Sequence, residues 1–116
     1  TRNVVRRWRA RTDGALLPLP NPIGEDRLDF PFVMEIQSDL LYRFAERVCA
    51  PLVREGAIPG LTERFYPTVV VVDQALRLHP LGVAVFLTQE LRDCAGSAKA
   101  AALPIEQALD MLFRGY

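Results

Sequence analysis

The chain has 116 residues, half of them hydrophobic, and its 14 basic residues balance its 14 acidic ones. This composition predicts one globular domain with a modest core and excludes a chain that is disordered throughout. The longest run without a charged residue spans residues 78–89, which is too short for the ~20 apolar residues of a membrane-spanning helix. We therefore expect a soluble protein without a membrane span.

The charges are distributed unevenly. Residues 1–12 carry five arginines and no acid, so this basic arm has a charge of +5 and residues 13–116 a charge of −5. Five like charges in one short segment predict an anionic binding surface outside it, most simply an acidic protein surface. Nucleic acid is the alternative partner. The proposed partner-binding residues of the arm are Arg2, Arg6, Arg7, Trp8, Arg9 and Arg11.

The next segment, residues 13–31, is rich in proline. Pro18, Pro20 and Pro22 alternate with other residues, and Pro31 closes the segment. Proline lacks the backbone N–H and fixes φ, so the segment is neither a regular helix nor a central strand. The alternating prolines favour an extended, polyproline-like strap, and the leucines between them predict that it lies along the surface of the domain.

Residues 32–52 show the three- and four-residue spacing of an amphipathic helix. The apolar positions are Val33, Ile36, Leu40, Leu41, Phe44, Val48 and Leu52. Charged residues occupy the other face of this predicted helix. Pro51 ends or kinks it, because the proline ring clashes with the carbonyl one turn earlier.

Two interpretations compete for residues 66–96. In the first, Pro67 begins a helix that stops at His79-Pro80, and a second helix runs from Val83 to Gly96. In the second, the valine-rich runs 69–72 and 83–87 are strands, which gives an α+β fold with a short hairpin at 69–87. We favour the two helices, because the punctuation by proline and glycine fits them better.

The C-terminal segment has a clear helical pattern. It begins near Pro104 and ends at Gly115, with an apolar stripe that includes Ile105. Met111 and Phe113 fall outside that stripe and widen the apolar face. We therefore predict that Met111 and Phe113 bind a protein partner or a second copy of the chain.

Together these patterns predict a mainly α fold, a small single-domain bundle of four to five helices. The divisions are a basic N-terminal arm at 1–12, a Pro-rich extended strap at 13–31 and a helical domain at 32–116.

Few residues offer catalytic chemistry. His79 is the only histidine, and Asp73 follows four valines, where an acid could serve an α/β enzyme. Cys49 and Cys94 lack the close spacing of zinc ligands, so we expect no metal, no cofactor and two poorly reactive core thiols. The thiols and the lack of a secretory signal place the chain in a reducing compartment, the cytoplasm or an organelle matrix.

These observations favour a non-catalytic accessory subunit or adaptor that binds other proteins in a larger assembly, or a homo-oligomer. A small nucleic-acid-associated regulatory protein that uses the basic arm is the alternative. A small α/β enzyme with Asp73 and His79 in its site ranks third.

Overall fold

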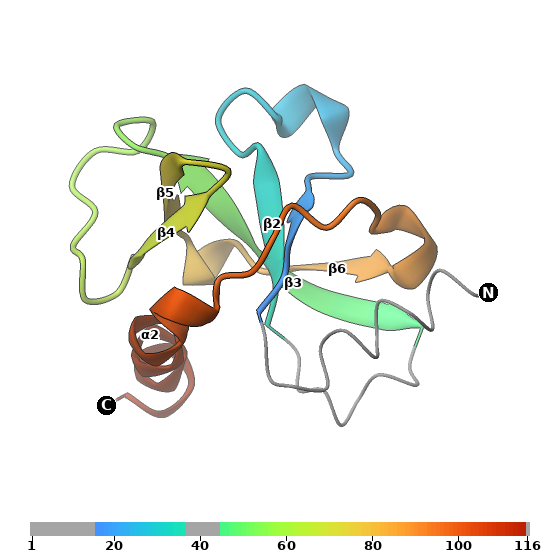
Figure 1. The fold of residues 1–116 in the computed structure, drawn as a ribbon. Coiled ribbons are helices and arrows are strands. Elements are labelled where there is room, and N and C mark those ends of the chain that lie inside the picture. The colour runs from blue at the N-terminus through green and yellow to red at the C-terminus, as the bar shows by residue number, and fades with distance from the viewer. Residues whose placement is uncertain (1–15, 37–44, 116) are drawn as a thin grey trace.

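The computed structural model describes residues 16–36 and 45–115. Over these residues the chain forms a curled six-stranded antiparallel sheet and one C-terminal α-helix (Figure 1). The strands are β1 (Pro18–Pro20), β2 (Phe32–Glu35), β3 (Glu46–Arg54), β4 (Thr68–Val71), β5 (Gln74–Leu78) and β6 (Ala84–Leu87). The helix α2 spans Ala102–Arg114. Short 3-10 turns are η1 (Gly24–Asp26), η3 (Pro80–Gly82), η4 (Thr88–Glu90) and η5 (Lys99–Ala101).

The predicted helical bundle is wrong. Residues 32–35 and 46–54 are strands where one amphipathic helix was expected, and residues 37–44 lie outside the described residues. The helices predicted over 67–78 and 83–95 are replaced by β4, β5 and β6. The prediction failed because the buried strands carry apolar residues on both faces. The periodicity of such a continuous apolar run does not distinguish a buried strand from a buried helix.

Strand β3 is the centre of the sheet. One side of β3 pairs with β2, and the other side pairs first with β6 and then with β5. Pro51 lies where β3 changes from one partner to the other, and no residue of β5 or β6 is opposite it. Its missing N–H therefore breaks no ladder bond there, while its carbonyl accepts a hydrogen bond from the backbone N–H of His79 at 2.9 Å.

The proline-rich segment contributes the edge strand β1, which pairs with β2. An edge strand tolerates proline because its outer N–H groups are not needed by the sheet. Of the described part of this segment, only Pro18–Pro20 forms a strand, whereas Gly24–Asp26 form the 3-10 turn η1. Leu17 and Leu19 are buried in the domain and do not lie along its surface.

The valine run forms half of a tight hairpin. Val69 and Val71 are buried, whereas Val70 and Val72 are exposed, which is the alternation of a strand. The strand interpretation was closer to the structure, but its hairpin at 69–87 does not form: β4 pairs with β5, and β6 pairs with β3.

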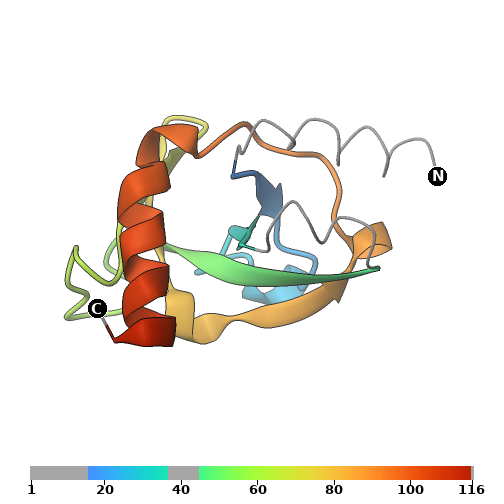
Figure 2. The ribbon, with the colours of Figure 1, turned by 90° about the horizontal axis from the view of Figure 1, so that it is seen from below.

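Two apolar clusters hold the fold together. The first lies between the sheet and α2 and includes Met34, Leu76 and Ile105. The second consists of Leu19, Val33, Cys49, Phe86 and Leu91. Figure 2 shows α2 at one end of the sheet, crossing the direction of β3.

The predicted C-terminal helix is confirmed. It ends at Gly115, whose φ of 83° is left-handed and whose N–H donates to the Met111 carbonyl at 3.1 Å. Within the described ranges, no helix has the length and apolar character needed to cross a membrane.

Candidate functional site

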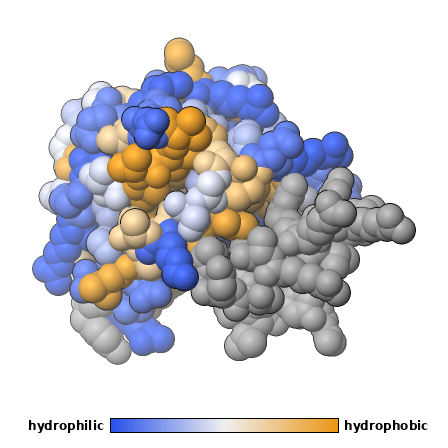
Figure 3. Space-filling view, viewed as in Figure 1, coloured by the Kyte–Doolittle hydropathy of each residue, from blue (hydrophilic) through white to orange (hydrophobic). Residues whose placement is uncertain are grey.

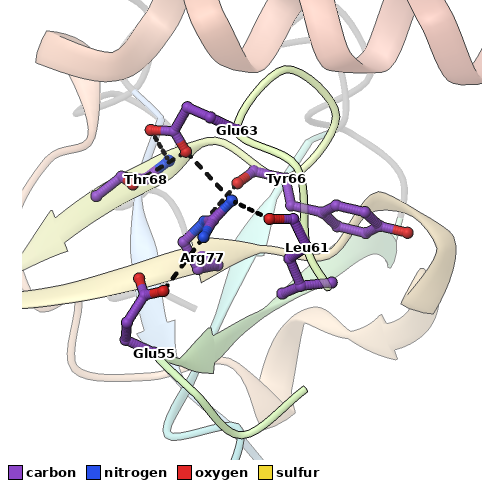
Figure 4. A network of polar contacts seen from close by, with 6 residues as sticks. All are labelled: Glu55, Leu61, Glu63, Tyr66, Thr68 and Arg77. Carbon is purple, nitrogen blue, oxygen red and sulfur yellow. Dashed lines mark hydrogen bonds and ion pairs between the residues drawn. The ribbon is translucent and has the colours of Figure 1, made fainter. Parts of the chain in front are cut away.

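A cluster of polar groups surrounds Arg77 on β5 (Figure 4). Its Nε donates to the Tyr66 carbonyl at 2.6 Å, and its Nη2 donates to the Leu61 carbonyl at 3.2 Å. Nη1 lies 3.2 Å from a carboxylate oxygen of Glu55, and Nη2 lies 3.3 Å from one of Glu63. All three guanidinium nitrogens are therefore engaged.

This cluster is a clamp for the loop between β3 and β4. The Arg77 side chain is only 11% exposed, whereas those of Glu55 and Glu63 are mostly exposed. Glu63 also accepts hydrogen bonds from the backbone N–H and hydroxyl of Thr68. Arg77 thus holds the loop carbonyls and both acids against β5. We therefore assign the cluster a structural role, which is to hold this loop in place.

A pocket of about 300 Å³ lies beside the second apolar cluster. It is bounded by the turn after β1, by β2, β3 and β6, and by the residues at the two ends of η3. Its lining residues are Asn21, Ile23, Asp26, Phe30, Val33, Cys49, Pro51, His79, Gly82, Ala84 and Phe86. Most of these are apolar, and the volume is at the lower end of the range for small-ligand pockets.

The polar groups of the pocket differ in how they are satisfied. The Asn21 side chain donates to the Phe30 carbonyl and accepts from the Ile23 N–H, both at 3.0 Å, so it braces the turn. His79 Nδ1 is buried without a hydrogen-bond partner among the described residues. Burial lowers the pKa of His79 from its ordinary 6.5, so the neutral imidazole is favoured. Tyr66 packs edge-on against that ring.

Asp73 and His79 do not form a common site. Asp73 lies in the turn before β5 and His79 follows the end of β5. The five residues of β5 lie between them, and a strand of that length places the two residues roughly 20 Å apart. The predicted enzyme site that joins them is therefore wrong.

The two thiols lie in different environments. Cys49 is buried in the second apolar cluster, but Cys94 is exposed, so the expectation of two core thiols is wrong for Cys94. Both are free cysteines. Over residues 16–36 and 45–115, no three His, Cys, Asp or Glu side chains gather in a group that could hold a metal ion.

The partner-binding residues predicted in the basic arm lie outside the described residues, from Arg2 to Arg11, Trp8 included. On α2, Met111 is half-buried, whereas Phe113 is 69% exposed in the last turn. Phe113 is thus available to a partner, and Met111 only partly so.

Sequence reasoning missed further exposed apolar groups. Val70 and Val72 project from the β4–β5 hairpin, over which Figure 3 shows a hydrophobic area. Val83 and Val85 are exposed along β6. The signal was present in the valine runs, because every second valine of a strand at the surface of a sheet points outward.

Comparison with known proteins gives one family. The profile described as CcdB protein matches residues 20–115, which covers all six strands but for the first two residues of β1, and α2 to its end. Members of this family are non-catalytic toxins of toxin–antitoxin pairs, which dimerise and bind protein partners such as the antitoxin and gyrase. The family gives no support to nucleic acid as a partner. A search of curated proteins finds no match. The match over most of the chain shows that this protein belongs to the CcdB family.

Proposed function

We propose that this chain is the toxin of a toxin–antitoxin pair and that it acts by binding a protein target, with DNA gyrase as the first target to test. The observation that carries the proposal is the family match over residues 20–115. The sequence pattern favoured a non-catalytic accessory subunit or adaptor that binds other proteins. The family match replaces this with a more specific proposal, a toxin that binds two protein partners, the antitoxin and the target.

The surface of α2 supports a contact with the target. Phe113 is 69% exposed in the last helical turn. Leu103 is also exposed but lies about 15 Å away at the other end of the same helix, so it serves as the control position. Aromatic side chains that are exposed in the free protein often anchor protein interfaces. We propose that Phe113 contributes to binding of a partner and that Met111, which is half-buried on the same helix, also contributes.

The test is tightly controlled expression in a bacterial host, followed by a supercoiling assay with purified gyrase. Growth arrest and inhibited supercoiling are expected for the unaltered chain. Phe113→Ser is expected to weaken both by about tenfold or more, whereas the matched Leu103→Ser should change them little. Arrest without any effect on gyrase would point to another target, and unimpaired growth at high expression would contradict the toxin assignment.

A further inference from the structure

Strand β6 has one paired edge and one open edge. It pairs with β3, and the described residues contribute no strand along its other side. The Thr88 N–H donates to the Ala45 carbonyl at 2.8 Å. Hydrogen-bonded and non-hydrogen-bonded pairs alternate in an antiparallel ladder, so Phe86 bonds to β3 and the backbone groups of Val85 and Leu87 point away from it.

The open edge is short. The Leu87 N–H is already taken by the Glu90 side chain, whose Oε1 lies 2.8 Å away. A charged side chain at a strand end limits unwanted pairing of an exposed edge. Val85, whose side chain is 57% exposed, therefore keeps the outward N–H and C=O that can bind another extended segment.

The pocket lies on the face of β6 that carries Ala84 and Phe86. A strand added beside β6 would place the side chain opposite Ala84 about 5 Å from it, on the pocket face. The small Ala84 leaves that approach open. Asp26 lines the same pocket, and its carboxylate has no ion pair or hydrogen bond to any described residue. A long basic side chain matches these features, because its stem contacts apolar walls while its charge meets a carboxylate.

We propose that the open edge of β6 pairs through Val85 with an extended segment of the antitoxin, and that this segment places a lysine or arginine side chain in the pocket beside Asp26. The inference rests on the proposed function, because it takes the antitoxin as the partner. The residues on either side of the basic one face the exposed row of Val83, Val85 and Leu87, so they should be apolar.

A second copy of the chain fits the edge less well. In a β6–β6 pairing, the side chains on the pocket face would be Ala84 and Phe86 of the copy. Phe86 is buried in its own apolar cluster, and Ala84 is too short to enter a neighbouring pocket.

The experiment selects phage-displayed random decapeptides on the purified full chain and measures the affinity of an enriched peptide by fluorescence anisotropy. We expect the enriched motif apolar–Lys/Arg–apolar. Val85→Pro removes the outward N–H and no N–H that bonds to β3, so it should weaken binding by about tenfold, and Val85→Thr should not. Asp26→Asn should weaken binding by a similar factor, whereas Asp29→Asn in the same turn should have no effect. Ala84→Phe, which fills the approach to the pocket, should abolish binding.

Circular dichroism confirms that each variant is folded; if Val85→Pro is not, Asp26→Asn and Ala84→Phe decide the outcome. Enriched peptides without the basic residue, or binding that survives Ala84→Phe, would overturn the inference. A native mass that falls from dimer to monomer in Val85→Pro would also overturn it, because β6 would then join two copies. Growth arrest separates the two proposals. Arrest without peptide binding refutes only this inference, whereas binding without arrest refutes the toxin assignment and with it the antitoxin as the partner, but not strand pairing at β6.

Discussion

The turn between β4 and β5 places a valine in a backbone geometry that disfavours β-branched residues. Val71 pairs with Gln74, so the hairpin loop has two residues, Val72 and Asp73, with φ of 49° and 60°. Two-residue hairpin turns with positive φ at both positions prefer Asn-Gly. A β-branched residue in this region is strained, at a cost of roughly 1–2 kcal/mol. We predict that Val72→Asn with Asp73→Gly raises the free energy of unfolding by about 1–3 kcal/mol.

Urea denaturation and thermal unfolding measure this effect. For a domain of this size, each kcal/mol moves Tm by roughly 4–8 °C, so a rise of about 4 °C or more is expected. Val70→Asn is the matched control: Val70 is exposed on the same hairpin but lies within β4, where asparagine is unfavourable. If the turn variant were no more stable than the unaltered chain, the strain argument would be refuted. The strain argument would also be refuted if Val70→Asn changed the free energy of unfolding as much as the turn variant does.

Three further predictions concern the clamp, the β3 junction and the pocket. Arg77→Met should lower the free energy of unfolding in urea by about 2–4 kcal/mol, because buried charge-assisted hydrogen bonds to two loop carbonyls are lost. An unchanged free energy of unfolding would show that Arg77 does not stabilise the loop. A Cβ on Gly82 would lie 2.9 Å from Pro51 Cγ, so Gly82→Ala should lower the free energy of unfolding by about 1–3 kcal/mol. Gly24→Ala is the control and should change it little, because a Cβ there meets nothing within 4 Å. Similar losses of stability in the two variants would contradict the steric argument. His79 has a lowered pKa in the folded chain, so the unfolded chain binds the extra proton, and stability should fall as pH drops below 6.5 towards the folded-state pKa. His79→Gln should remove that part of the slope, and an unchanged slope in a pH series of unfolding curves would exclude His79 as its source.

Some features follow from local sequence alone. The C-terminal helix was predictable because three- and four-residue spacing places Ile105 and Ala108 on its buried face, and because Gly115 supplies the left-handed end. The prolines at 18 and 20 excluded a central strand, and β1 is indeed at an edge. These properties depend on the backbone within a few residues.

The sheet and the candidate site depend on contacts between distant segments. Val48, Cys49 and Ala50 belong to a strand because β2 pairs on one side of β3 and β6 on the other, and no local pattern records that arrangement. The pocket likewise joins the turn near Asn21 to His79 through β3. Spacing in the sequence reports which face of an element is apolar, but strand pairing decides which elements share a core, because its hydrogen bonds form between residues far apart in the chain.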